Sequence, residues 1–370
     1  MSIKVDVIII GAGIIGLAVG YNLSKKGIKT IILESEKDIG TVNSSRNTEV
    51  IHAGIYYKIN SLKSKLCQKG KEDLYNFCSK YNVRFKKIGK IFLAKNKEEI
   101  NRLDEIYNLS YKNGLKLKEI SKKKLKLIEP NVIGLQALFS PTSGIIDSHD
   151  LIQKLNSLYL DNEGIIVCKT PFLDAKEIYN NIWEVKIGDQ DRTIIETKLI
   201  INCAGLKALD ISKKKFANLN NINNNHIKGA YLRYSDSKII KHIIYPALQP
   251  GIIEERVDTT PDLYGDIRFG PSIEKINLSH DFSVPSNLIE RFAPIINSYI
   301  NNIDKNKLRL DQAGIRPRIS IGNDKNPDFY IDWQTNHAWL DLLGIESPGL
   351  TASLAIGEYV LKKILHKKIL

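Results

Sequence analysis

The sequence predicts an α/β protein in which one domain is assembled from three separated chain segments. A second domain, of α+β type with a mostly antiparallel sheet, is inserted between those segments. Three observations support this fold class. The chain opens with a strand–helix–strand pattern over residues 5–34, an apolar strand returns at 198–205, and a glycine-rich loop leads into a closing helix over 344–366.

Each element follows from a local pattern. "VDVIII" (5–10) is an apolar strand that runs into the turn "GAGIIG", residues 14–26 form a helix that ends before Gly27, and "KTIILE" (29–34) is the next strand. The elements expected after these are, in order, a polar segment at 41–60, a helix at 65–82, a strand at 89–94, a helix at 97–112, a short helix capped by Ser121, a helix at 150–162, strands at 164–168, 182–188, 192–197 and 198–205, a loop at 218–226, strands at 229–234, 240–245 and 266–269, and helices at 286–300 and 350–366.

The order of these elements sets the expected domain boundaries. We assign residues 1–85, 141–212 and 318–370 to the three-segment domain, because its strands are apolar and alternate with helices. Residues 86–140 and 213–317 form the inserted domain, where short strands dominate. No internal repeat is visible.

Composition is that of an ordinary globular protein, with 43% hydrophobic and 26% charged residues in a chain of 370. No apolar run approaches the roughly 20 residues that span a bilayer, and the first apolar run leads directly into a glycine turn, so we expect a cytoplasmic protein. Four cysteines without a C-x-x-C pair predict neither a disulfide framework nor a metal site. They are Cys67, Cys78, Cys168 and Cys203.

The net charge of +13 has more than one interpretation. Lysines occur throughout the chain, so we interpret the excess as general surface charge, with attraction to anionic substrates or contact with an anionic membrane surface as alternatives. Nucleic-acid binding is not expected, because aromatic residues do not interleave with the lysine clusters at 122–124 and 213–215.

A dinucleotide site is predicted at the first turn. Gly11, Gly13 and Gly16 form G-x-G-x-x-G between the first strand and its helix, and Glu34 ends the second strand about 20 residues further on, where this motif places an acid for the ribose hydroxyls. The turn therefore indicates a Rossmann-like domain. The candidate residues for this half of the cofactor are Gly11, Gly13, Ile14, Ile15, Gly16, Glu34 and Ser35.

The segment after the acid favours FAD over NAD. A nicotinamide dehydrogenase usually continues with alternating strands and helices, whereas this chain places "TVNSSRNTEVIHAG" (41–54) there. The side chains of Ser44, Ser45 and Asn47 suit the pyrophosphate and ribityl chain of the longer cofactor, and His52 and Ala53 would then run beneath its ring.

Six motifs, taken together, resemble a known family. They are "GAGIIGLA" (11–18), "SSRNTEVIHAGIYY" (44–57), "INCAGL" (201–206), "RFGP" (268–271), "AGIRP" (313–317) and "LLGIESPGLTASLAIGEYV" (342–360). This set resembles the FAD-dependent D-amino-acid oxidase superfamily and, within it, the L-2-hydroxyglutarate oxidases and dehydrogenases. The motifs span nearly the whole chain, and the second and last are long and specific.

The resemblance implies a Rossmann-like FAD-binding domain of three segments plus a substrate domain, with specific cofactor contacts. Gly349, Leu350 and Thr351 would offer backbone N–H groups to the flavin pyrimidine oxygen, at a helix end that stabilises negative charge on the reduced ring. The other contacts implied are the glycine turn and Glu34 at the ADP half, Ser44, Ser45, Arg46 and Asn47 along the middle, Phe172 at adenine, and Ala204 and Gly205 close to the cofactor.

Substrate residues are also implied. Arg316 would bind the carboxylate of a 2-hydroxy acid bidentately and direct C2–H toward flavin N5. His52 would take the hydroxyl proton, or else only pack against the flavin, and Tyr57 and Tyr231 would line the pocket. Related glycerol-3-phosphate dehydrogenases have an arginine that matches Arg316.

The chain departs from the family pattern near the predicted substrate site. Asp258 occupies the place of a histidine in a V-H-x-T run, and "EER" (254–256) replaces small or apolar neighbours, while 243–251 also differs. Asp258 would repel a second substrate carboxylate unless a cation such as Arg256 intervened.

The resemblance implies an FAD-dependent enzyme that oxidises an L-2-hydroxy acid, with L-2-hydroxyglutarate as the substrate and oxygen or a membrane quinone as the electron acceptor. One alternative is a D-amino-acid or glycine oxidase of the same fold. Another, in a different class, is a flavoprotein that acts on RNA, although no RNA-binding module accompanies the positive charge.

Overall fold

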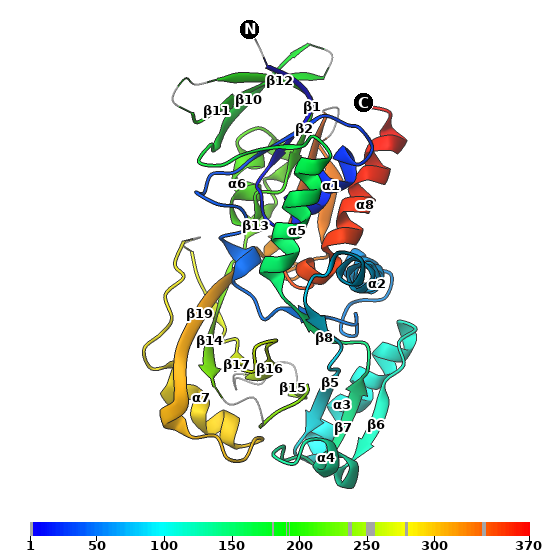
Figure 1. Ribbon diagram of the computed structural model, residues 1–370, viewed down its shortest axis with the longest axis vertical. Helices are drawn as coiled ribbons and strands as arrows, with labels where there is room; N and C mark the ends of the chain where they lie inside the picture. Colours follow the sequence, from blue (N-terminus) through cyan, green and yellow to red (C-terminus); the bar gives the residue numbers. More distant parts are fainter. Residues whose placement is uncertain are drawn as a thin grey trace.

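The computed structural model describes residues 3–179, 181–189, 191, 193–235, 239–248, 256–277, 280–334 and 338–370. Its main feature is a pair of large sheets at opposite ends of the molecule, one of eight strands and one of nine (Figure 1). The first carries a parallel centre covered by helices, and the second is mostly antiparallel. The predicted fold class is confirmed.

The eight-stranded sheet gathers strands from distant parts of the chain. Its centre is parallel and runs in the order β9, β2, β1, β12, β22, with β21 antiparallel at the edge, while β11 and β10 extend antiparallel from the first half of β12. Buried apolar runs such as that of β1 are typical of such a centre, because both faces are covered. The strands are β1 Ile3–Ile10, β2 Thr30–Leu33, β9 Ile165–Val167, β10 Phe172–Tyr179, β11 Ile182–Ile187, β12 Ile194–Asn202, β21 Tyr330–Trp333 and β22 Trp339–Leu343.

Helices cover both faces of this sheet. On one face α1 packs between α5 and α8, and α2 packs on α8, which explains why α1 is apolar almost all round (Figure 1). On the other face α6 and a cluster of aromatic rings around Trp339 fill a second core. These helices are α1 Ile14–Ser24, α2 Leu62–Tyr81, α5 Ser148–Asp161, α6 Ala208–Lys213 and α8 Gly349–Lys367.

The nine-stranded sheet runs in the order β18, β14, β17, β16, β15, β5, β7, β6, and β19 also pairs with β14. Its described pairs are antiparallel apart from β15 with β5. The elements are β5 Lys90–Ala94, β6 Lys118–Ser121, β7 Gln136–Ser140, β14 Ile227–Tyr234, β15 Ile243–Pro246, β16 Asp258–Pro261, β17 Ile267–Gly270, β18 Glu274–Lys275 and β19 Leu308–Arg316, with helices α3 Lys97–Lys112, α4 Lys122–Ile128 and α7 Leu288–Asn297.

Two small sheets and four short 3-10 helices complete the described part of the fold. The small sheets are β3–β8–β4 and β13–β20. The elements are β3 Val50–Ile51, β4 Phe85–Lys86, β8 Gly144–Ile146, β13 Ile222–Asn224 and β20 Ile319–Ile321, with 3-10 turns at Asn43–Ser45, Gly205–Lys207, Ala217–Leu219 and Lys305–Lys307.

Some sequence predictions were confirmed and some were wrong. Ser121 caps α4, as predicted, by accepting a hydrogen bond from the Lys124 amide. The predicted loop at 218–226 was wrong in part, because β13 lies within it; its backbone pairs with β20 although its asparagine side chains are exposed. Strands β10 and β16 were not predicted, since β10 buries only Ala175 and β16 consists of an aspartate, two threonines and a proline, so neither shows an apolar alternation. The domain boundaries stay a prediction.

Within the described ranges, the helices are all too short or too polar to cross a bilayer. The same residues contain no cluster of three or more His, Cys, Asp or Glu side chains placed to hold a metal ion.

Candidate active site

A cavity of about 720 Å³ brings together most of the predicted site residues. This volume is within the range of small-molecule and cofactor sites. The predicted residues that line it are Gly11, Gly13, Ile14, Ile15, Glu34, Ser35, Ser44, Arg46, Asn47, His52, Tyr57, Phe172, Ala204, Gly205, Tyr231, Asp258, Arg316, Gly349, Leu350 and Thr351. Gly16, Ser45 and Ala53 are not among the lining residues; Ser45 Oγ instead donates to the Val42 carbonyl.

The glycine turn lies at one end of the cavity and leaves no room for side chains. Gly11 has a φ of +99°, and a Cβ there would lie 2.7 Å from the Cys203 carbonyl oxygen. A Cβ on Gly16 would collide with the Gly11 carbonyl. The turn can therefore bring backbone close to a ligand, at the N-terminus of α1.

Glu34 closes this end. Its carboxylate is buried and accepts hydrogen bonds from the Ala12 amide (2.7 Å) and the Glu36 amide (2.9 Å). These bonds hold the Glu34 carboxylate at the cavity wall. Its contact with the ribose of the cofactor stays a prediction.

The polar segment lines the cavity and contacts both the start of α1 and the nine-stranded sheet. Ser44 Oγ accepts a hydrogen bond from the Ile14 amide at 2.9 Å, and Asn43 Oδ1 accepts one from the Ile315 amide at 3.2 Å. Because Ile315 precedes Arg316 on β19, the same segment contacts both the glycine turn and the strand that carries the predicted substrate arginine.

Arg46 has an unusual environment. Its guanidinium lies over the Phe282 ring at 4.6 Å, and its Nε is buried without a hydrogen-bond partner among the described residues. An unsatisfied buried N–H that belongs to a cavity-lining cation suits an anionic ligand such as a pyrophosphate.

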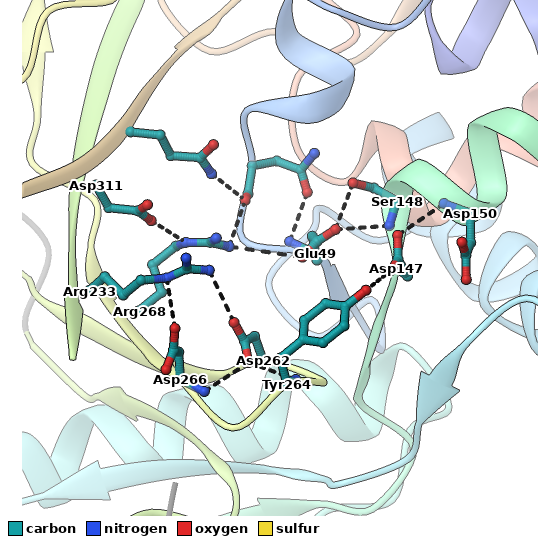
Figure 2. Close-up of polar contacts among 12 residues, drawn as sticks. Glu49, Asp147, Ser148, Asp150, Arg233, Asp262, Tyr264, Asp266, Arg268 and Asp311 are labelled. Atoms are coloured by element: carbon teal, nitrogen blue, oxygen red, sulfur yellow. Dashed lines mark hydrogen bonds and ion pairs between the residues drawn. The ribbon is translucent and has the colours of Figure 1, made fainter. Parts of the chain in front are cut away.

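A network of polar contacts fixes the chain just after Arg46 (Figure 2). The Asn47 carbonyl accepts hydrogen bonds from Arg268 (3.2 Å) and Gln312 (3.0 Å), which lie on β17 and β19. Glu49 accepts from the amide and hydroxyl of Ser148 at 2.9 and 2.7 Å. The segment is thus held by the nine-stranded sheet and by α5, and His52 follows three residues after Glu49.

His52 lies between a lysine and a serine. Its Nδ1 is 3.4 Å from Lys90 Nζ, and its Nε2 is 3.3 Å from Ser347 Oγ. Its backbone N–H donates to Thr351 Oγ1 at 3.0 Å, so the start of α8 holds it in place. Burial, and then the positive charges of Lys90, Arg316 and Arg256, lower the pKa of His52 well below its usual range. The imidazole is neutral at pH 7.

The other predicted substrate residues surround the same part of the cavity. Arg316 ends β19, and Tyr231 is buried on the neighbouring strand β14. Burial raises the pKa of Tyr231 and that of Tyr57, so both hydroxyls keep their protons and can donate hydrogen bonds.

Asp258 is paired with a cation. Arg256 Nε lies 2.9 Å from Asp258 Oδ1, and the arginine NH2 group donates to Oδ2 at 3.0 Å. Burial raises the pKa of Asp258, although Arg256 opposes the change. Arg256 therefore stands beside the carboxylate as the sequence suggested, and its guanidinium also lies 5.1 Å from the Tyr245 ring centroid. Residues 254 and 255 lie outside the described residues.

Sequence reasoning missed three residues around His52. Lys90, Tyr245 and Ser347 each lie within or beside the predicted motifs or strands, but none was singled out. A lysine at the start of the otherwise apolar strand "KIFLA" was the available signal, because a charged residue in a buried strand needs a reason to be there.

The cavity extends from a glycine turn of the nucleotide-binding type to the cations near His52. This arrangement is typical of an enzyme that transfers electrons between a substrate and a bound nucleotide cofactor. The family described as "FAD dependent oxidoreductase" matches this chain over residues 6–362, and the chain belongs to this family. It is an FAD-dependent oxidoreductase. The cavity volume, the unsatisfied Arg46 Nε and the two helix N-termini at its wall all fit FAD.

Individual relatives agree with this assignment. The chain is 32% identical to a mitochondrial L-2-hydroxyglutarate dehydrogenase of Arabidopsis thaliana, over 98% of this chain and 84% of the relative. It is 28% identical to a glycerol 3-phosphate dehydrogenase of Caloramator mitchellensis, over 98% and 75%. The fold matches an L-alpha-glycerophosphate oxidase from Mycoplasma pneumoniae with a TM-score of 0.88 at 23% identity, over 97% and 94%.

Proposed function

We propose that this chain oxidises an L-2-hydroxy acid to the 2-oxo acid, with L-2-hydroxyglutarate as the substrate. One observation carries the proposal. The neutral imidazole of His52 and the guanidinium of Arg316 line the same cavity, at the end where Arg256 also lies. The 32% identity to a relative named L-2-hydroxyglutarate dehydrogenase supports the choice of substrate.

Arg316 binds the C1 carboxylate in this proposal. A guanidinium offers two parallel N–H donors, which fix the plane of a carboxylate and so the direction of the C2–H bond. Tyr57 and Tyr231, which keep their protons, donate further hydrogen bonds from the cavity wall.

His52 accepts the hydroxyl proton. Its low pKa keeps the imidazole neutral, and a neutral nitrogen is required of a base. Bound FAD supplies the acceptor for the hydride that leaves C2.

The charges of the cavity favour a dianionic substrate. Three cations, Lys90, Arg316 and Arg256, act on His52. Asp258 is paired with Arg256, and the cavity-lining Glu346 is paired with Lys63 and Arg318, so positive charge is in excess next to His52. The second carboxylate of 2-hydroxyglutarate suits this imbalance, and so does the phosphate of glycerol 3-phosphate, the compound named for another relative. An amino acid fits less well, because its ammonium group would meet further positive charge.

Cofactor contacts form the other half of the proposal. The first turns of α1 and α8 face the cavity with the positive ends of their dipoles, and Arg46 adds a cation between them. We assign the ADP half to the glycine turn, Glu34, Ser35 and Phe172, the middle to residues 44–47, and the flavin end to His52, Ala53, Ala204, Gly205 and Gly349, Leu350 and Thr351.

Anaerobic mixing of the holoenzyme with a substrate panel tests the proposal. The panel contains L- and D-2-hydroxyglutarate, L-2-hydroxybutyrate, glycerol 3-phosphate, glycine and D-alanine, and absorbance is followed at about 450 nm, where oxidised flavin absorbs. Bleaching that is fastest with L-2-hydroxyglutarate supports the proposal. Bleaching by glycerol 3-phosphate alone, or by the amino acids alone, contradicts it.

The electrons leave for oxygen or a membrane quinone. Helix α4 supports contact with an anionic membrane, because its lysines are exposed together with Leu127, which is 68% exposed. Sedimentation with vesicles that contain about 30% anionic lipid tests this, and binding that persists in Lys122→Glu/Lys126→Glu contradicts the assignment to α4.

A further inference from the structure

Lys90 is a buried lysine behind the proposed base. It begins β5 and is 2% exposed, and its Nζ lies 3.4 Å from His52 Nδ1 and 3.8 Å from the centroid of the Tyr245 ring. No carboxylate among the described residues forms an ion pair with it at 4.0 Å or less. An amine in this position is held mainly by an imidazole and an aromatic face.

The groups around Lys90 come from several elements. Burial is the largest influence and lowers its pKa to about 7; Arg256 acts in the same direction, and Asp258 and Cys67 oppose it. Near neutral pH the side chain therefore exists both as ammonium and as amine. The titratable and charged groups that face the pair are Tyr56 and Tyr57 beside His52, Cys67 of α2, Tyr245 of β15, Arg256, Asp258 of β16 and Arg316 of β19.

The form of Lys90 determines which nitrogen of His52 carries the proton. An ammonium can only donate, so it requires an unprotonated Nδ1 and leaves the proton of the neutral ring on Nε2. An amine can accept, which allows Nδ1–H and leaves the Nε2 lone pair available on the side of Ser347. Nε2 can act as a base in the second arrangement and not in the first.

We propose that Lys90 is a positioning residue that selects the Nδ1–H tautomer of His52 and takes the Nδ1 proton during substrate oxidation. The inference rests on the proposed function. When the substrate O–H bond breaks, its proton forms an Nε2–H bond, and the Nδ1 proton moves to Lys90 Nζ, which becomes an ammonium. The C2–H bond breaks as hydride, and its electron pair goes to FAD. The ammonium loses its proton to solvent between turnovers.

The kinetic test compares wild type with Lys90→Met and Lys90→Arg. Flavin reduction by L-2-hydroxyglutarate in the wild type should accelerate as pH rises through about 7, and Lys90→Met should lose this rise and fall in rate by about tenfold or more. Lys90→Arg keeps a cation at every pH and should be slower still. Lys71→Met, which replaces another buried lysine, on α2 and away from the cavity lining, is the matched control and should keep the wild-type profile. An unchanged profile in Lys90→Met overturns the proposal.

A second readout needs no substrate. In holoenzyme labelled with ¹⁵N-histidine, long-range ¹H–¹⁵N spectra report which ring nitrogen is protonated, and His52→Asn identifies the resonance. The wild type should change from Nε2–H to Nδ1–H as pH rises through about 7, and Lys90→Met should show no such change. FAD content and Tm exclude misfolded variants. A tautomer that is constant with pH in the wild type overturns the inference, whereas a pH-dependent tautomer without turnover of 2-hydroxy acids contradicts only the proposed function.

Discussion

The two ends of the cavity are built in different ways. The end with the glycine turn uses backbone groups and a few side chains: Glu34 accepts from the Ala12 amide within one βαβ unit, Ser44 Oγ accepts from the Ile14 amide, and Gly11 lies against the Cys203 carbonyl. The other end collects charged side chains from strands far apart in the sequence, such as Asp258 of β16 and Arg316 of β19, with Lys90 of β5 behind His52. One end depends on close packing of backbone, and the other on a balance of charges.

The largest effect is expected at the charged end. Arg316→Met removes the guanidinium proposed to bind the C1 carboxylate and should lower kcat/KM for L-2-hydroxyglutarate by about a thousandfold, since a charge-assisted bidentate contact is worth several kcal/mol. FAD content should stay at the wild-type level. Stopped-flow flavin reduction and the 450 nm to 280 nm absorbance ratio measure both. A loss below about tenfold would exclude Arg316 as the residue that binds the substrate carboxylate.

The pair of Arg256 and Asp258 tests whether charge at this end of the cavity selects the substrate. The double variant Arg256→Met/Asp258→Asn removes one charge of each sign and avoids an unpaired buried charge. If Arg256 attracts the second carboxylate, the preference for L-2-hydroxyglutarate over L-2-hydroxybutyrate should fall by about tenfold. The ratio of the two kcat/KM values measures this preference. An unchanged ratio would exclude Arg256 from substrate recognition.

At the other end, Gly11→Ala should weaken FAD binding. The new Cβ meets the Cys203 carbonyl at 2.7 Å and the residue has a φ of +99°, so we expect about a tenfold higher Kd for FAD. Gly27→Ala has a comparable φ of +74° and nothing within 4 Å, which makes it a matched control for backbone strain alone. Titration of the apoprotein with FAD gives the Kd of each variant. An equal loss of FAD affinity in the two variants would show that the contact with Cys203 is unimportant.

The smallest effect concerns stability. Burial lowers the pKa of Lys90 to about 7 in the folded protein from 10.5, so the unfolded chain binds more protons between these values. The stabilising contribution is therefore fully present above 10.5 and is lost as pH falls through about 7. Relative to Lys90→Met, the wild-type Tm should rise by about 2 °C from pH 6.5 to 9. A Tm difference that does not change with pH would mean that Lys90 does not titrate in this range.

The difference between the two ends of the cavity also explains how much of the site could be predicted from the sequence. Gly11 and Glu34 could be brought to one site from the sequence, and both line the cavity, because the spacing of a turn and a strand end is a local property. Most motif residues also line the cavity. Lys90 and Tyr245 were missed because their neighbourhood is created by strand pairing, β15 against β5, which no local pattern specifies. Strand β13 was missed for a related reason, since its partner β20 lies about a hundred residues away.

Thr351 has a consequence for how the protein is made. Its hydroxyl accepts a hydrogen bond from the His52 amide and donates to the Val50 carbonyl, so the start of α8 forms part of the wall beside the proposed base. A nascent chain still tethered to the ribosome lacks that wall until residue 351 has emerged. FAD binding that uses this wall must therefore follow synthesis of residue 351, and products that terminate before this residue will lack the wall.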